Sequence, residues 1–217
     1  MTYNSLEKDG ETLTQGGYSD KIVVDENYVL RLPDNISPDR AAPLLCAGIT
    51  MYSPLVHWRA GPAKKVGIIG LGGLGHMGVK IAYALGSEIS VLSHSLKKQE
   101  DGKSLNGNFD LLINTLSIEA DWDEYLNLLR LDGTMVVVGN SGKKSPVSPS
   151  TLISGRRNLA GSVIGGIKET QEMLDFCSKH NIASDIENVP IQKVNESYER
   201  VVKSDVRYRF VIDMNSL

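Results

Sequence analysis

The sequence predicts an α/β protein with a doubly wound (Rossmann) parallel sheet, preceded by a small β-rich segment. Short apolar runs alternate with helix-length segments through the middle of the chain, an order that is typical of a parallel sheet with right-handed crossovers. A cluster of glycines follows the first of these runs, where a strand would pass into a helix. In such folds the ligand crevice lies at the carboxyl ends of the strands.

Five apolar runs are candidates for the parallel strands. We expect strands over residues 66–70, 89–93, 109–113, 134–138 and 158–164, and helices over 75–85, 95–105 and 168–180. A further helix should start at an Asp121 cap, turn Tyr125, Leu126, Leu128 and Leu129 to one apolar face, and end at Gly133. Only one crossover fits between Ser93 and Phe109, because a βαβ connection needs at least about 10 to 12 residues. A six-stranded sheet would need another strand and helix there. We therefore expect the order 2-1-4-5-6 of a six-stranded dinucleotide-binding sheet, with strand 3 lost from one edge.

The flanking segments predict smaller elements. Before the sheet, residues 18–24 and 28–32 are rich in β-branched and aromatic residues, which favours two short strands, and residues 41–55 favour a helix. After the sheet, a strand near Ile186, a helix over 195–203 and a strand over 208–212 are expected. The apolar face of that last helix should turn inward; it is formed by Tyr198, Val201 and Val202.

Composition narrows the class of protein. The 217 residues carry a net charge of −3, and a negatively charged protein does not attract nucleic acid electrostatically. No run of about 18 apolar residues occurs, so no membrane span is expected. The first residues lack the apolar core of a secretion signal. The two cysteines, Cys46 and Cys177, are far apart and form no disulfide framework, so we expect a cytoplasmic protein.

The glycine cluster at residues 70–78 is the sharpest motif. Gly70, Gly72 and Gly75 have the G-x-G-x-x-G spacing, with an apolar strand before them and a helix after them. The first glycine allows the tight turn, the second lets a pyrophosphate approach the backbone, and the third lets helix and strand pack closely. The alternative is a strand–helix turn without a ligand. Five of these nine residues are glycine, and each glycine loses much conformational entropy on folding, which disfavours a purely structural turn.

The residues after the second strand indicate which dinucleotide binds. A carboxylate there would favour NAD, because it accepts hydrogen bonds from a free ribose 2′-hydroxyl. This chain instead has Ser93, Ser95, Lys97 and Lys98. Hydroxyls and ammonium groups suit a 2′-phosphate, which indicates NADP(H). The alternative is that Lys97 and Lys98 only solvate a helix.

Several stretches together resemble the zinc-dependent medium-chain alcohol dehydrogenases, and among them the cinnamyl alcohol dehydrogenase group. The matching stretches run nearly end to end: GGYSDKIVVDENYVLRLP, APLLCAGITMYSPL, GLGGLGHMGVKIA, LDGTMVVVG, GSVIGGIKETQEMLDFC and DVRYRFVID. The resemblance implies reversible reduction of small aldehydes to primary alcohols with NADPH. It also implies a two-domain subunit that dimerises.

The resemblance also implies roles for single residues. It makes Cys46 a catalytic zinc ligand and places Thr50 beside the nicotinamide. The remaining assigned positions all contact the cofactor: Gly72, Gly73 and Leu74 at the pyrophosphate; Ser93, Ser95 and Lys98 at the 2′-phosphate; and Thr115, Val138, Gly139, Ser162 and Ile164 at the nicotinamide half. Without the surrounding motif, Cys46 would be interpreted as a buried free cysteine.

The chain departs from this family in its zinc ligands. Two cysteines cannot form a four-cysteine structural site, and the histidines (His57, His76, His94 and His180) do not stand in the family's zinc motif. Only Cys46 remains as a catalytic zinc ligand, so we expect no zinc to be retained. We interpret residues 1–40 as a remnant of the catalytic domain, 41–182 as the NADP-binding domain, and 183–217 as a return segment that packs on the catalytic domain. A piece on the order of a hundred residues would then be absent.

Two alternatives to an enzyme remain open. The chain could be a non-catalytic NADP(H)-binding module, or it could be a dimerisation partner that uses the edge of its sheet. The run 159–164 should form that edge, because it carries neither proline nor charge that would discourage pairing with another strand. We expect a homodimer through it, unless residues 165–168 fold back and cover the edge.

Overall fold

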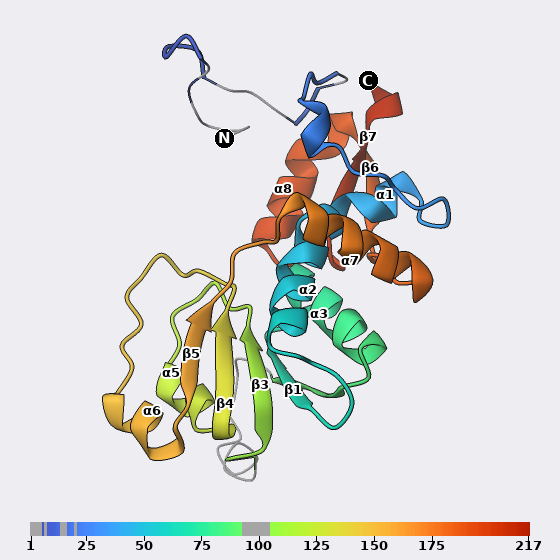
Figure 1. Ribbon diagram of the computed structural model, residues 1–217. Coiled ribbons are helices and arrows are strands. Elements are labelled where there is room, and N and C mark those ends of the chain that lie inside the picture. Colours follow the sequence, from blue (N-terminus) through green and yellow to red (C-terminus); the bar gives the residue numbers. More distant parts are fainter. Residues whose placement is uncertain (1–5, 7, 14–16, 20, 93–104) are drawn as a thin grey trace.

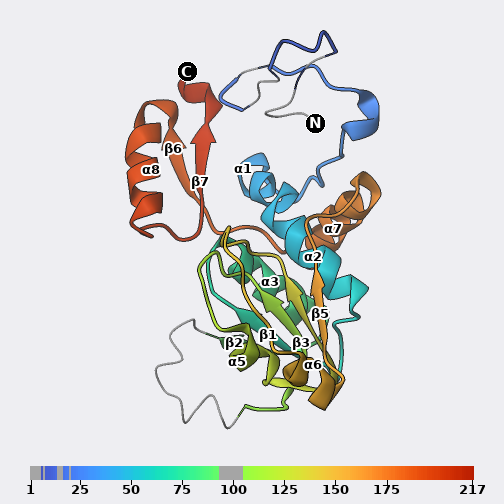
Figure 2. The ribbon, with the colours of Figure 1, turned by 90° about the vertical axis from the view of Figure 1, so that its left-hand side faces the viewer.

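The computed structural model describes residues 6, 8–13, 17–19, 21–92 and 105–217. Among these residues, the main sheet has five parallel strands in the order β2-β1-β3-β4-β5, of which Figure 1 labels all but β2 and Figure 2 labels β2. The strands are β1 (Lys65–Ile69), β2 (Glu88–Leu92), β3 (Phe109–Asn114), β4 (Leu129–Val137) and β5 (Asn158–Gly161). This order is the one predicted for a six-stranded sheet without its third strand. The expected helix over 95–105 lies almost wholly outside the described residues.

Helices cover both faces of this sheet, as Figures 1 and 2 show. On one face lie α2 (Ala47–His57), α3 (Gly73–Ala84) and α7 (Ile167–Lys179), and on the other lie α5 (Trp122–Leu126) and α6 (Pro149–Gly155). Successive strand residues alternate between the faces: Ile68 and Ile113 belong to one apolar cluster, and Ile69 and Leu112 to the other. Burial on both faces explains why the central strands are continuously apolar.

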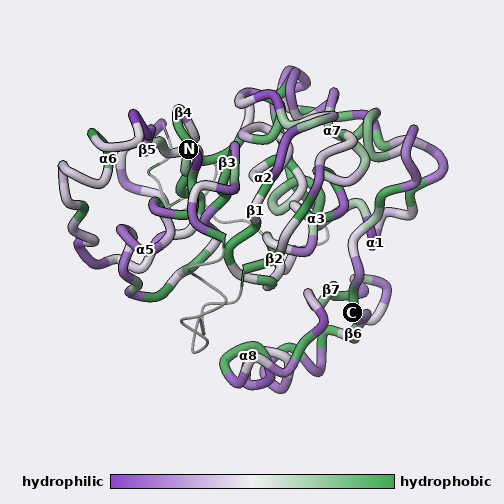
Figure 3. Tube along the Cα trace, turned by 90° about the horizontal axis from the view of Figure 1, so that it is seen from below, coloured by the Kyte–Doolittle hydropathy of each residue, from purple (hydrophilic) through white to green (hydrophobic). Residues whose placement is uncertain are grey.

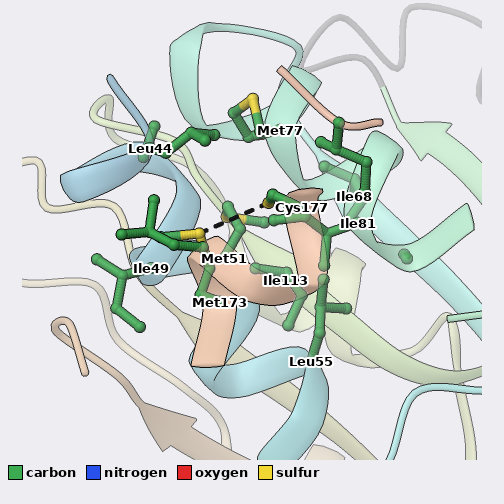
Figure 4. Close-up of a cluster of buried hydrophobic side chains, with 14 of the residues drawn as sticks. Leu44, Ile49, Met51, Leu55, Ile68, Met77, Ile81, Ile113, Met173 and Cys177 are labelled. Carbon is green, nitrogen blue, oxygen red and sulfur yellow. Dashed lines mark hydrogen bonds between the residues drawn. The ribbon is translucent and has the colours of Figure 1, made fainter. Parts of the chain in front are cut away.

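The larger cluster joins α2, α3 and α7 to the middle of the sheet. Figure 4 shows Met51 of α2, Ile81 of α3 and Met173 of α7 packed around Ile113 of β3, and all four side chains are fully buried. Cys177, also fully buried, lies 3.6 Å from the sulfur of Met173. Burial raises the pKa of this thiol to about 12, so Cys177 is part of the core and is not a reactive thiolate.

The end of the chain forms a separate two-stranded parallel sheet. It consists of β6 (Glu187–Pro190) and β7 (Phe210–Asp213), with α8 (Val194–Val202) as the crossover between them. Short 3-10 turns follow β6 (Ile191–Lys193) and β7 (Met214–Ser216). In Figure 1 the strands of the main sheet point toward this C-terminal unit. The predicted strands and helix of this region are present, shifted by one or two residues.

The prediction that the apolar face of α8 turns inward is wrong. Tyr198, Val201 and Val202 are 56%, 49% and 84% exposed, and the buried residue of α8 is Ser197. Figure 3 shows hydrophobic and hydrophilic residues side by side along this helix. Among the described residues, Tyr18 reaches this face through a hydrogen bond between its hydroxyl and that of Tyr198, but the face stays largely exposed. The amphipathic pattern therefore identified the helix but not its surroundings.

The two strands predicted over 18–24 and 28–32 are also absent. The described residues there form an extended path and a 3-10 turn at Glu26–Tyr28. Val23 is 99% exposed and Tyr28 is 69% exposed. A strand needs a partner for its backbone groups, and no described segment lies alongside to provide one. The chain then enters α1 (Pro38–Ala41) and a 3-10 turn, Ala42–Leu45.

Three predicted boundaries need correction. The helix expected over 41–55 is interrupted at Cys46, where φ and ψ are −121° and −73°, and α2 begins after it. The helix expected between Asp121 and Gly133 begins at its Asp121 cap as predicted but ends at Leu126, because Leu129 already belongs to β4 and pairs with Phe109 of β3. The strand expected over 158–164 ends at Gly161.

The shortening of β5 has a local cause. The backbone N–H of Ser162 donates to the carbonyl of Val137, the last residue of β4. Beyond that point no neighbouring strand remains to pair with, and Val163 and Ile164 are 81% and 60% exposed. β5 is nevertheless the outer strand of the described sheet, as predicted. No helix among the described residues is long and apolar enough to cross a membrane.

Candidate functional site

The residues predicted for the nicotinamide half lie along the carboxyl edge of the sheet. Thr115 follows β3, Val138 and Gly139 follow β4, and Ser162 follows β5. Since these strands are parallel, their carboxyl ends meet at one edge. The structure therefore brings these four residues together. Ile164 lies two residues further on, outside the strand.

Backbone hydrogen bonds hold this edge together. The N–H groups of Val138 and Gly139 both donate to the carbonyl of Asn114, at 3.0 Å each. The hydroxyl of Thr115 donates to the carbonyl of Ile69 at 2.7 Å, which ties β3 to the end of β1. A Cβ at Gly139 would overlap the backbone of Leu116. The loops after β3 and β4 thus touch, and only glycine fits at that contact.

The glycine loop connects β1 to α3 in the predicted way. Gly70 has φ of +89°, a conformation that L side chains rarely adopt. A Cβ at Gly75 would lie 2.0 Å from the carbonyl oxygen of Gly70, so the helix can approach the strand this closely only with glycine there. The first and third glycines of the motif therefore have structural roles whether or not a ligand binds.

Gly72 differs from the other glycines of the motif. A Cβ built there would have no protein atom within 4 Å, so packing does not require glycine at this position. The space lies at the N-terminus of α3, for which Gly72 is the N-cap residue. The first N–H groups of a helix have no intrahelical partner and attract anions. Leu74, in the same turn, packs its side chain against the apolar core.

Arg209 reaches this helix terminus from the C-terminal unit. Its guanidinium lies 3.0 to 3.2 Å from the position that a Cβ on Gly73 would take. Its Nε is buried and has no hydrogen-bond partner among the described residues. An unsatisfied cationic donor beside unpaired helix N–H groups is a site for an anion. Arg209 could not be identified as a site residue from the sequence, because no local spacing links DVRYRFVID to the glycine loop. Only the fold brings the two together.

His76 lies in the same cluster and is 4% exposed. Its Nδ1 lies 3.0 Å from the carbonyl of Gly73, and its ring stacks on Tyr208 with centroids 4.3 Å apart and an interplanar angle of 10°. Burial lowers the pKa of the imidazole, and the nearby Lys80 adds to the effect. The ring is therefore neutral at pH 7.

Cys46 and Thr50 occupy the start of α2. Cys46 is exposed as the N-cap residue, and its carbonyl accepts a hydrogen bond from the N–H of Thr50, which is buried. A Cβ at Gly165 would overlap the side chain of Ile49, so the loop after β5 runs against α2. Cys46 and Thr50 therefore lie at the start of a helix that borders the carboxyl edge of the sheet.

The described residues do not form a zinc site. No group of three or more His, Cys, Asp or Glu side chains among them is arranged to hold a metal ion. His57 is exposed at the end of α2 and packs edge-on against Trp58. Cys46 is thus not part of a group of three or more metal ligands in the described part of the chain. Ser93, His94, Ser95 and Lys98 lie outside the described residues.

Comparison with known proteins places this site in a family. Residues 103–179 match the family of zinc-binding dehydrogenases. NADP-dependent alcohol dehydrogenase C of Mycobacterium bovis is 55% identical over 100% of this chain and 67% of its own length. The chain belongs to the zinc-type alcohol dehydrogenase family. It spans about two thirds of the length of the curated relatives it matches, 63 to 67%.

Two solved structures support the fold of this dehydrogenase chain. A cinnamyl alcohol dehydrogenase from Sorghum bicolor superposes with a TM-score of 0.89 and 39% identity, over 95% of this chain and 64% of that one. CAD from Helicobacter pylori, complexed with NADP(H), gives 0.88 and 39%, over 99% and 66%. The alignment with the relative from M. bovis runs over 234 positions, more than the 217 residues of this dehydrogenase chain. Relatives therefore contain internal residues without a counterpart here, in agreement with a shortened sheet.

The different roles of two glycines give a test of the loop. Gly75→Ala should lower the free energy of unfolding by about 3 kcal/mol or more, because the new Cβ would collide with backbone. Gly72→Ala should cost less than about 1 kcal/mol, because its Cβ enters open space at an N-cap position. Urea unfolding of both variants measures the difference. Equal losses would show that Gly72 is also required for packing.

Proposed function

We propose that this chain binds NADP(H) at the carboxyl edge of its sheet, and that the whole dehydrogenase interconverts small aldehydes and primary alcohols. The observation that carries the proposal is the open space at Gly72, bordered by the first turn of α3 and by the guanidinium of Arg209. Relatives that are 55% identical to this chain are NADP-dependent alcohol dehydrogenases, which supports the choice of cofactor. When bound, NADPH supplies the hydride for aldehyde reduction.

The diphosphate of the cofactor is the group that suits this space. The N–H groups of Gly73, Leu74 and Gly75 belong to the first turn of α3 and can donate to phosphate oxygens. Arg209 provides a positive charge and the buried, unsatisfied Nε beside them. The absence of a side chain at Gly72 leaves room for the phosphate to approach the backbone.

The two ends of the cofactor then follow the edge of the sheet in opposite directions. β2 ends at Leu92, so Ser93 directly follows that strand. We assign Ser93, Ser95 and Lys98 to the 2′-phosphate. On the other side of the glycine loop, residues at the ends of β3, β4 and β5 would line the nicotinamide half; they are Thr115, Val138, Gly139, Ser162 and Ile164.

Catalysis in the whole enzyme would involve the start of α2. We assign Thr50 to the nicotinamide and Cys46 to a catalytic zinc ion, for which it would be one of several ligands. In this proposal residues 1–40 belong to the catalytic part, 41–182 to the cofactor domain, and 183–217 return toward the catalytic part. A second candidate function, a non-catalytic NADP(H)-binding module, is favoured by the lack of a group of three metal ligands among the described residues.

Cofactor preference tests the proposal directly. The chain should bind NADPH at least about tenfold more tightly than NADH, because only NADPH offers the 2′-phosphate to Ser93, Ser95 and Lys98. Ser93→Asp should reverse this preference, since a carboxylate repels phosphate and accepts from a free ribose hydroxyl. Fluorescence titration of both cofactors measures the affinities. Equal affinities for the unaltered chain would refute the 2′-phosphate assignment.

Metal content separates the enzyme from the binding module. We expect the purified 217-residue chain to contain no stoichiometric zinc and to reduce no aldehyde, because the described residues place no group of three metal ligands around Cys46. Elemental analysis and an NADPH-consumption assay with a simple aldehyde test both points. One zinc ion per chain, lost on Cys46→Ser, would instead show that further ligands exist and would favour the catalytic function.

We also propose that the chain forms a homodimer through residues 159–164. β5 is an outer strand of the sheet, and no charge or proline interrupts it. Val163 and Ile164, which directly follow β5 and its Ser162, add exposed apolar surface. A two-fold axis beside β5 would pair two copies of the strand and cover these side chains.

Charge at this edge should dissociate the dimer. Val163→Lys would place two ammonium groups near the two-fold axis, and we expect a monomer at micromolar concentration, measured by light scattering. Tyr83→Lys is a matched control, because Tyr83 is 77% exposed on α3, away from β5, and should leave the mass unchanged. A monomeric unaltered chain would contradict the proposal.

A further inference from the structure

The imidazole of His76 is held in one orientation and one tautomer. A carbonyl oxygen can only accept, so Nδ1 carries the proton that is donated to Gly73 at 3.0 Å. Nε2 then has a lone pair, and it is buried without a hydrogen-bond partner among the described residues. An apolar side chain would fill the same volume without the cost of burying this nitrogen. Packing alone therefore does not account for a histidine here.

The ring of His76 contacts the segment that carries Arg209. Tyr208, whose ring stacks on His76, precedes Arg209 directly, and both residues are tied to the strand region of β6. The N–H of Tyr208 donates to the carbonyl of Asp185 at 3.3 Å, and the carbonyl of Arg209 accepts from the N–H of Glu187 at 2.9 Å. The stack thus fixes the backbone from which the Arg209 side chain extends.

A second contact lies one turn further along α3. The ammonium group of Lys80 donates to the carbonyl of Ala183 at 2.9 Å and to the carboxylate of Asp185 at 2.8 Å. His76 and Lys80 are four residues apart and so lie on the same side of the helix. Together they hold α3 against the C-terminal unit on two successive turns, with Arg209 at the end nearest the glycine loop.

Without a bound anion, electrostatic repulsion opposes the position of the Arg209 guanidinium beside the N-terminus of α3, so other contacts have to hold it there. The N-terminus of a helix carries a partial positive charge, which disfavours a guanidinium beside it until an anion is bound. Lys80 and Arg209 both disfavour a proton on His76, while Asp185 favours one. A neutral ring can stack on Tyr208 without adding a further positive charge to this cluster.

We propose that His76 is a positioning residue for cofactor binding: its stack on Tyr208 holds the guanidinium of Arg209 over Gly73, ready for the diphosphate of NADP(H). The inference rests on the proposed function, because it assigns the anion to that cofactor. His76 itself touches no phosphate in this scheme; it acts through Tyr208 and Arg209. Replacing His76 should therefore weaken cofactor binding only while Arg209 is present.

A double-mutant cycle tests this dependence on the full chain. We expect His76→Leu to weaken NADPH binding about tenfold and Arg209→Gln to weaken it by at least as much. The double variant should bind no more weakly than Arg209→Gln alone, because the two residues act as one unit. His76→Phe keeps an aromatic ring against Tyr208 and should restore most of the affinity.

Ile81→Ala is the control for general destabilisation. Ile81 is fully buried on the same helix, so its truncation should lower the melting temperature while the affinity for NADPH changes less than about twofold, since Ile81 lies outside the contacts that couple to Arg209. If the losses from His76→Leu and Arg209→Gln simply add in the double variant, or if His76→Phe binds as weakly as His76→Leu, the positioning role is wrong. If the unaltered chain binds no NADPH, the proposed function itself fails.

Discussion

The close approach of α3 to β1 is the constraint on which the candidate site depends. The helix begins directly above the end of the strand because Gly75 leaves no side chain between its own backbone and the carbonyl of Gly70. This contact directs the first turn of α3 along the carboxyl edge of the sheet. With a bulkier residue the helix would have to move away, and its unpaired N–H groups would no longer border the space at Gly72.

Much of the main sheet could be predicted from the sequence. The central strands are buried on both faces, so their apolar runs stand out, and the five described strands have the order that the short interval between Ser93 and Phe109 predicted. Errors arose where the pattern fits two structures. Leu128 and Leu129 have helical spacing after Asp121, yet both pack in the smaller apolar cluster and Leu129 enters β4. The ladder with β3 decided the outcome, and that ladder is not visible locally.

The candidate site was predictable only in part, for a physical reason. The residues of the glycine loop are adjacent in sequence, and their spacing specifies a turn whose geometry is local. Arg209 and Tyr208 reach the same place through the packing of the C-terminal unit on α3, which depends on contacts such as that of Lys80 with Asp185. The exposed face of α8 shows the same limit: amphipathic spacing reveals which side is apolar, but not whether anything covers it.

The position of Arg209 also links two distant parts of the chain thermodynamically. The proposed anion site needs the C-terminal unit to be docked on α3, because α3 provides the unpaired N–H groups and the C-terminal unit provides Arg209. A ligand that binds this docked form stabilises it by mass action relative to any form in which the unit has come away. Cofactor binding and the docking of the C-terminal unit are therefore coupled. A bound cofactor would stabilise the packing of β6, α8 and β7 on α3, although β6 and β7 form a separate sheet.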